Sequence, residues 1–390
     1  MCARSIFPLG AAVELRQLDV DPHPLMARLR EHEPVSWLPA IDGWLVTRHD
    51  LALEVMLDAD AFTVEDPRFS TGQVVGASML SLDGREHARH RRPFVSPFRI
   101  TAVRERFTTV ADARARELIV ALEPAGACEL RRSFAGPVAA SIVARALGLE
   151  DAEVESVLSW YDAIVASVTQ ISIGGGPTAE GEHAFALLRE RLEPVINDTT
   201  RASLLASAAA GSELSSQEIV SNAAVLMFGG IETTEGMIAN AALHLLERPQ
   251  MLEQVRDDLS LLDAAIDESL RLEPAAAVID RYARTSTELG EAAVGRGDLV
   301  RISLSAANRD PAVFENPNSY DLERPNGRRH LAFAQGPHLC VGVHLARLEA
   351  REALGALFET LPRLRLDPDR PAVVRGLVFR KPLRLDAVWS

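Results

Sequence analysis

The feature that most constrains this chain is a glycine- and proline-containing loop, residues 330–344, centred on Cys340. The loop leads into an apolar segment with helical periodicity, Val341 to about Phe358. A cysteine at the start of a helix lies where unpaired backbone N–H groups and the helix dipole favour a thiolate. Gly336 and Gly342 leave room for a large flat ligand near the sulfur. Cys340 is therefore a candidate axial ligand for haem iron; the alternative at this point is a buried structural cysteine.

The composition of the chain narrows its class. An apolar fraction of 47% over 390 residues is enough for a sizeable core, and no apolar run is long enough to predict a membrane span. The net charge of −14 argues against nucleic acid or an anionic membrane as the main partner. Three widely spaced cysteines make no disulfide framework, and no secretory signal is recognisable at the N-terminus. We expect a cytoplasmic protein.

Most of the chain has the periodicity of amphipathic helices, and short alternating segments predict a few strands. The segment Pro67–Ser81, rich in glycine and serine, predicts a mobile loop. No internal repeat or low-complexity linker interrupts the pattern, so we expect one domain over residues 1–390, mainly α with small β-sheets. The expected helices are 114–122, 137–147, 154–168 and 182–196. The expected strands are 35–39 and 43–47, which form a small hairpin, and 278–283 and 298–303, with a final hairpin in 372–389.

The longest predicted helix begins at a capping box formed by Ser215 and Glu218 and ends before Pro249. That is about 32 residues, or roughly 48 Å. Apolar and small residues on every side predict a helix buried at the centre of the molecule. Gly229 and Gly230 in its middle destabilise it by about 1 kcal/mol each relative to alanine. We interpret them as a kink, or as a place where something packs against bare backbone.

An acid and an alcohol, Glu232 and Thr233, follow the two glycines in this apolar helix. A carboxylate there is costly unless it is solvated or functional. The alternative, a surface or N-cap glutamate, fits poorly because caps belong at helix ends. We therefore interpret the pair as functional.

A basic helix is predicted over residues 86–92, where His87 and Arg91 share one face. Such a face is ordinarily just solvated. In a haem protein, however, a histidine and an arginine four residues apart make a good clamp for a propionate carboxylate. A second motif, Glu268-x-x-Arg271, places an acid and a base on one helix face, although the pattern is common by chance.

The segment from Phe333 to Gly342 resembles the haem-binding signature of the cytochrome P-450 family, F-G-x-G-x-H-x-C-x-G, with Ala334 in place of one glycine. Further motifs occur in the family's order over nearly the whole chain. They are Gly229–Thr234, similar to the oxygen-groove motif; Glu268 and Arg271 with Arg324, similar to a buried cluster that supports the haem face; and His87, Arg91, Arg281 and His330, which lie where relatives bind the propionates.

The resemblance implies the cytochrome P-450 fold, with haem b held between the long central helix and the cysteine loop. Cys340 would be the proximal thiolate ligand, and Glu232 with Thr233 would relay protons during oxygen activation. The implied activity is a monooxygenase that uses O2 to hydroxylate or otherwise oxidise its substrate in secondary metabolism or catabolism. No flavin- or iron–sulfur-binding segment is recognisable, so we expect electrons from a separate ferredoxin. Arg347 is a hypothetical contact for that partner, or simply a surface charge.

The resemblance also places apolar residues at the substrate pocket, which predicts a lipophilic small organic molecule. The alternative is that some of these side chains only pack the core. The residues are Met227, Phe228, Val278, Leu377 and Val378, with the loop from Val74 to Met79.

Three other functions stay open. A zinc site would use Cys340 with the flanking His338 and His344, but no further ligand has matching spacing. A haem-thiolate sensor or electron carrier would not need a proton relay, so Glu232 and Thr233 argue against it. An atypical reaction on the same fold, such as coupling, desaturation or nitration, is not addressed by any motif.

Overall fold

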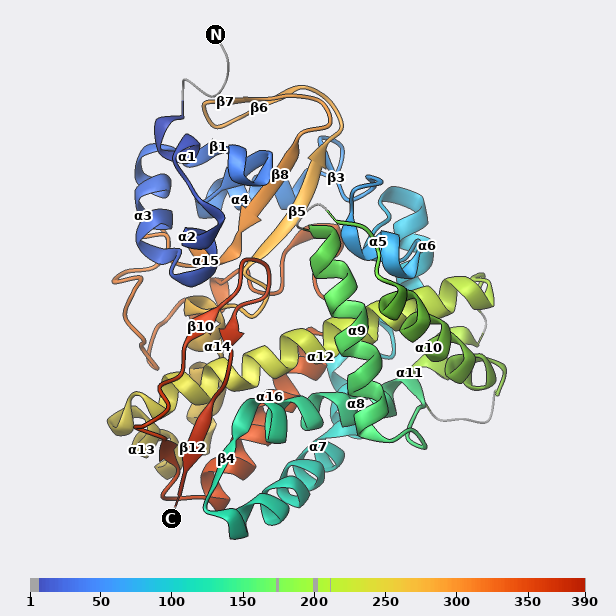
Figure 1. Cartoon of the computed structure of the whole chain (residues 1–390), viewed down its shortest axis with the longest axis vertical. Helices are drawn as coiled ribbons and strands as arrows, with labels where there is room; N and C mark the ends of the chain where they lie inside the picture. Colours follow the sequence, from blue (N-terminus) through green and yellow to red (C-terminus); the bar gives the residue numbers. More distant parts are fainter. Residues whose placement is uncertain (1–6, 173–174, 199–202, 211, 390) are drawn as a thin grey trace. The chain divides into compact units, whose positions relative to one another are not determined.

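A computed structural model describes residues 7–172, 175–198, 203–210 and 212–389 of the chain (Figure 1). The chain divides into two compact units. Unit 1 comprises Met1–Thr63, Gly236–Cys340 and Leu364–Ala387, and unit 2 comprises Val64–Glu235, Val341–Arg363 and Val388–Ser390. Each unit is described by itself.

Unit 1 is built on a five-stranded sheet of order β1-β2-β8-β5-β3 (Figure 1). The predicted hairpin is confirmed: β1 and β2 are antiparallel, with Trp37 opposite Trp44. β2 and β8 are parallel, β8 and β5 antiparallel, so residues distant in sequence form one surface. Apolar side chains from these strands pack with helix α4 into one core cluster. The bounds are β1 Val35–Leu38, β2 Gly43–Val46, β3 Phe62–Thr63, β5 Val278–Ala283, β8 Leu299–Ser303 and α4 His49–Leu57.

The rest of unit 1 consists of helices and short strands. A second apolar cluster joins the N-terminal helices to β1 and β2 through Leu29, Leu38 and Leu45. The expected C-terminal hairpin is also present, with β10 and β11 antiparallel. Further elements of unit 1 are α1 Pro8–Ala11, α2 Leu15–Val20, α3 His23–His32, α13 Pro249–Asp257, α14 Leu262–Leu272, α15 Leu304–Ala307, β6 Thr287–Leu289, β7 Ala292–Val294, β9 Arg365–Leu366, β10 Val374–Arg375 and β11 Lys381–Pro382.

Unit 2 is helical. α7 and α16 lie against each other along their length, with Phe107, Ala111 and Ala115 of α7 buried. The prediction of a mobile loop over residues 67–81 is partly wrong. Part of this segment forms a short helix, α5, in which Thr71, Val74 and Val75 are buried. The helices are α5 Ser70–Val75, α6 Gly84–Val95, α7 Ile100–Leu122, α8 Gly136–Leu147, α9 Val154–Ser172, α10 Ala179–Asn197, α11 Leu204–Ala209 and α16 Val343–Thr360.

The longest helix, α12, spans Ser216–Leu246 and its 31 residues confirm the prediction. The capping box is present: the Ser215 N–H donates to Glu218 Oε2 at 2.8 Å, and the Glu218 N–H donates to Ser215 Oγ at 3.3 Å. The chain passes from unit 2 to unit 1 within this helix, after Glu235. Across the described part of the chain, no helix has the length and apolarity that crossing a membrane requires.

Candidate active site

Cys340 lies in unit 1, in the turn that follows the short 3-10 helix Gly336–His338, and its side chain is half-buried. The Cys340 N–H donates to the Phe333 carbonyl oxygen at 2.9 Å, which closes the loop on itself. Ala334 adopts φ 57, a left-handed conformation that glycine would adopt without strain. Gly336 has φ 73, and a Cβ there would lie 2.6 Å from the Met56 carbonyl oxygen. The loop conformation therefore depends on glycine at position 336 and tolerates alanine at 334.

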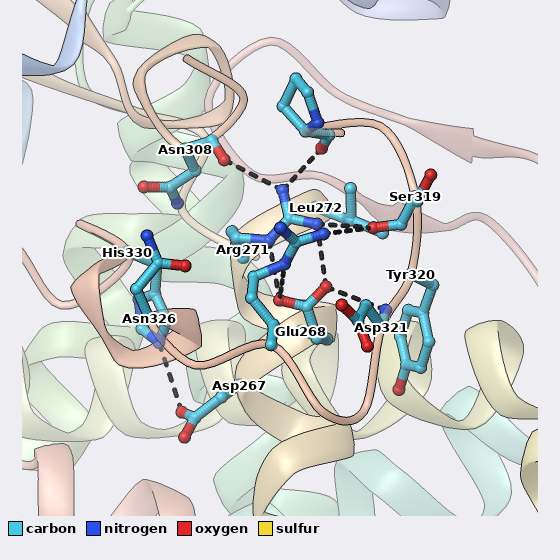
Figure 2. A network of polar contacts seen from close by, with 12 residues as sticks. Asp267, Glu268, Arg271, Leu272, Asn308, Ser319, Tyr320, Asp321, Asn326 and His330 are labelled. Carbon is cyan, nitrogen blue, oxygen red and sulfur yellow. Dashed lines mark hydrogen bonds and ion pairs between the residues drawn. The ribbon is translucent and has the colours of Figure 1, made fainter. Parts of the chain in front are cut away.

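His330 begins the same loop and is buried. Its Nδ1 accepts the Ala332 N–H at 3.2 Å, so Nε2 carries the proton and faces Asp267 Oδ1 at 3.3 Å (Figure 2). The Phe333 ring packs beside it, 6.0 Å between centroids. Both ring nitrogens of this predicted propionate ligand are thus in contact with protein groups of unit 1.

A buried ionic network lies in unit 1 around Glu268 and Arg271 of α14 (Figure 2). Glu268 accepts two hydrogen bonds from Arg271, at 2.8 and 2.9 Å, and one from Arg324 at 2.9 Å. Arg271 also donates to the carbonyl oxygens of Asn308 and Ser319, at 3.2 and 2.8 Å. The predicted acid–base motif on α14 is therefore a real ion pair that fixes the segments preceding the cysteine loop.

Arg281 lies on β5 of unit 1 and is buried, and its Nη1 donates to the Asp280 carbonyl oxygen at 2.8 Å. The Asp280 carboxylate is itself held by Arg301 of β8 through two bonds of 2.7 Å. In unit 2, His87 and Arg91 lie one turn apart on α6, with His87 buried and Arg91 half-buried. The shared face predicted for this pair is confirmed.

The middle of α12 is mostly buried but carries a strip of partly exposed residues. They are Leu226, Gly229, Gly230 and Thr233, spaced at i, i+3, i+4 and i+7, which is one helix face. A Cβ at Gly229 would meet nothing within 4 Å, whereas one at Gly230 would lie 2.6 Å from Val143 Cγ2. Gly229 therefore borders open space, and Gly230 is required for packing on α8.

The acid and alcohol predicted to be functional lie at this strip. Thr233 Oγ1 donates to the Gly229 carbonyl oxygen at 2.5 Å. Glu232 is buried, with 4% of its surface exposed, and its carboxylate accepts a hydrogen bond from the hydroxyl of Tyr161 on α9. The side chain is neither a helix cap nor a surface glutamate, as the sequence indicated.

The predicted pocket residues differ in their surroundings. Met227 and Phe228 are buried in α12, and Val278 is buried at the start of β5. Leu377 and Val378 are half-buried in the C-terminal hairpin, and Leu377 packs against the apolar cluster of the N-terminal helices. For Leu377 this contact favours the core-packing alternative.

The residues present fit a haem group. The sulfur lies in a loop of unit 1 that contains glycine, the partly exposed strip on α12 in unit 2 offers bare backbone, and each unit carries arginine and histidine side chains of the kind that pair with carboxylates. Among the residues that the structure describes, no group of three or more His, Cys, Asp and Glu side chains could hold a metal ion. This finding gives no support to the zinc alternative, which needs three or four protein ligands.

Sequence reasoning missed the polar groups around Glu232. Tyr161 is 71 positions away in the chain, and a second buried carboxylate, Glu235, faces Arg131 and Arg132. Glu235 follows Glu232 by one helical turn, and this spacing could have indicated that a second carboxylate lies near Glu232.

Comparisons with known proteins agree with this geometry. Residues 183–370 match the model of the family described as Cytochrome P450. The chain is 32% identical over 379 residues to Cytochrome P450 107B1 of Saccharopolyspora erythraea, covering 89% of each chain. It is 31% identical to 20-oxo-5-O-mycaminosyltylactone 23-monooxygenase of Streptomyces fradiae, covering 91% of this chain and 86% of the relative. The solved structure of the ligand-free P450 monooxygenase TamI has a TM-score of 0.85 at 30% identity, covering 98% of this chain and 96% of that one.

Proposed function

We propose that this chain, which belongs to the cytochrome P450 family and is a P450 monooxygenase, uses O2 to hydroxylate a lipophilic small organic molecule. The observation that carries the proposal is the half-open strip of α12, where an acid and an alcohol, Glu232 and Thr233, follow bare glycine backbone. A protein that only bound haem would not require a buried acid at that point.

The cofactor we propose is haem b, with Cys340 as the proximal thiolate ligand. Haem bound to an anionic sulfur supplies oxygen activation, because the sulfur donates electron density toward the iron. Arg281, with His87 and Arg91, would hold the propionates by charge-assisted hydrogen bonds. His330 would do so only by giving up its contact with Asp267.

The chain's own contribution to the chemistry is proton delivery. The carboxyl group of Glu232 is buried in the protein and can exchange a proton. Thr233 carries a hydroxyl on the partly exposed face of α12. A carboxyl group and a hydroxyl in adjacent positions can pass protons through water. Gly229 keeps the helix backbone uncovered beside them, which leaves space for small molecules.

The proposed substrate class rests on apolar side chains. Met227, Phe228, Val278 and Val378 would line the pocket, and an apolar lining selects an apolar ligand. One relative is named for monooxygenation of 20-oxo-5-O-mycaminosyltylactone, an organic molecule.

We propose a ferredoxin-type protein as the electron donor and the cytoplasm as the location. Leu339, directly before Cys340, is 38% exposed, so a protein partner can approach the ligand loop from solvent.

The test begins with the purified haem protein and a library of metabolites, scored by the shift of the haem absorption band on binding. A compound that binds is then incubated with NAD(P)H, a surrogate ferredoxin and its reductase under labelled ¹⁸O2. The proposal expects a product that carries one ¹⁸O atom. Unlabelled product would indicate desaturation or coupling, and binding without any product would indicate a sensor or electron carrier.

A further inference from the structure

Two buried carboxylates lie one turn apart on α12 in unit 2. Glu232 is 4% exposed and Glu235 is fully buried. Residues three apart share a helix face, so two anionic groups here would repel each other in a medium of low dielectric constant. The fold must compensate them, and it does so in different ways.

Glu235 is compensated by arginine. Arg131 Nη1 lies 3.4 Å and Arg132 Nη1 3.7 Å from its carboxylate oxygens. Both arginines come from a π-helix, Arg131–Ala135, a rare element that often occurs at functional sites. Gly136, directly after it, allows the close approach, since a Cβ there would lie 3.1 Å from Glu235 Oε1. An arginine ion pair requires the anionic carboxylate, so this contact suits a fixed charge.

Glu232 accepts a hydrogen bond from a neutral group, the hydroxyl of Tyr161, and also interacts electrostatically with Arg132. A phenol can donate to a carboxylate and can also accept from a carboxylic acid. The contact therefore survives gain or loss of a proton on Glu232, which an arginine contact would not. Tyr161 is itself 1% exposed, so its position is fixed by packing.

The same cluster reaches solvent on one side. The Arg132 side chain is 43% exposed and bonds Asp162 at 3.1 Å, whose side chain is 51% exposed. Asp162 follows Tyr161 in α9. Charged and polar groups thus extend from the surface to the middle of α12 within one unit.

We propose that Tyr161 is the positioning residue for Glu232 in proton delivery, and that Glu235 with Arg131 and Arg132 is a fixed-charge support for it. This proposal rests on the oxygenase function proposed above. In each cycle Glu232 releases one proton toward Thr233 and regains one from the solvent side. Tyr161 keeps its own proton over the cycle, so the cluster is unchanged at the end.

The first test needs no turnover. Infrared difference spectra of the ferric protein between low and neutral pH report the carbonyl band of a protonated carboxylic acid, and E232Q assigns that band by its loss. Y161F should shift the assigned band to higher frequency, because the carboxyl loses its hydrogen bond. Y320F is the matched control: it removes another buried phenol contact, Tyr320 Oη to the Ala265 carbonyl oxygen at 2.7 Å, in unit 1. An assigned band that is unmoved in Y161F would overturn the proposal.

The second test is a double-mutant cycle on oxygen use. With a compound found in the binding screen, Y161F should lower the product formed per NAD(P)H by about tenfold and raise the solvent isotope effect, as expected when a relay group is misplaced. In the E232Q background the same change should have no further effect, because Tyr161 acts through Glu232. An equal loss in both backgrounds would show a general structural role. The infrared result does not depend on the oxygenase function. Failure of the positioning role of Tyr161 can therefore be distinguished from failure of the proposed function.

Discussion

Glu268 and Arg271, one turn apart on α14, form a buried two-bond ion pair, with Nε–Oε1 2.8 Å and Nη2–Oε2 2.9 Å. Arg271 is fully buried and Glu268 is 1% exposed. Removing Arg271 would leave the buried Glu268 carboxylate with Arg324 as its remaining arginine partner, so its charge would be only partly compensated. We expect Arg271→Ala to lower the free energy of unfolding by about 3–5 kcal/mol, measured by urea denaturation.

The control for this prediction is an arginine that pairs with two acids but lies at the surface. Arg116 bonds Asp112 and Glu359, and its side chain is 45% exposed. Arg116→Ala should change the free energy of unfolding by less than about 1 kcal/mol. Equal losses in the two variants would contradict the supporting role of the buried network.

Stability at acid pH should depend on Glu273. Burial alone would raise the pKa of this carboxyl, but its bonds to His23 Nε2 at 2.9 Å and Arg380 Nε at 2.8 Å hold the pKa at about 2. A lowered pKa in the folded state stabilises the fold above the unfolded value and loses that effect as pH falls. We expect up to about 3 kcal/mol of unfolding free energy to disappear between about pH 4.5 and 2. Chemical denaturation at several pH values in this range should show that the free energy of unfolding depends less steeply on pH in Glu273→Gln than in wild type. An identical pH dependence would contradict the assignment.

Glu349 on α16 should act in the opposite direction. Burial raises the pKa of this carboxyl well above 4.5, and no described group bonds its Oε2. Its folded state therefore holds a proton that the unfolded chain releases, and stability falls as pH rises above about 4.5. Glu349→Gln removes the ionisation. The stability of the variant relative to wild type should grow by up to about 1.4 kcal/mol per pH unit until the folded pKa is reached. A constant difference between pH 5 and 8 would contradict this.

Alanine at the two neighbouring glycines of α12 should have different effects. Gly229→Ala enters open space, so the apoprotein should gain about 0.5–1 kcal/mol from helix propensity. Because the new methyl group covers bare backbone, haem incorporation or substrate binding should weaken, as measured by absorption spectra. Gly230→Ala would press on Val143 Cγ2, and overpacking of this kind destabilises by about 1–3 kcal/mol. If ligand binding weakened in Gly230→Ala and not in Gly229→Ala, our assignment of the open face to Gly229 would be wrong.

Thr233 provides a direct test of the proton relay. Thr233→Ala removes the hydroxyl while leaving the Glu232–Tyr161 contact in place. We expect NAD(P)H consumption to continue while product formation falls, because protons reach oxygen less selectively. Thr234→Ser, at a buried position of the same helix, is the control and should remain coupled. Full coupling in Thr233→Ala would contradict the role assigned to the hydroxyl.

Local patterns predicted the elements well where one segment carries its own signal. The capping box of Ser215 and Glu218 located the start of α12, and alternating residues located β5 and β8. The Glu268–Arg271 pair was predictable because both residues lie on one helix turn. The helix α5 was missed because Gly72 and Gly76 indicate a loop, whereas burial of Val74 and Val75 stabilises the helix.

The groups around Glu232 were not predictable for a different reason. The contact with Tyr161 joins α9 to α12, and that with Arg131 depends on a π-helix that has no sequence pattern of its own. Such contacts are set by how helices pack rather than by periodicity. The sequence resemblance that made His330 a candidate propionate ligand likewise did not predict its contact with Asp267 through Nε2.

The central claim is that the Cys340 thiolate is the haem ligand, and the carbon monoxide spectrum of the reduced protein tests it most directly. Wild type should show the strongly red-shifted absorption band of a thiolate-bound haem. Cys340→Ser should abolish this band even where haem is still bound, since an oxygen ligand donates less electron density than sulfur. A Cys340→Ser protein with the wild-type band would contradict the claim.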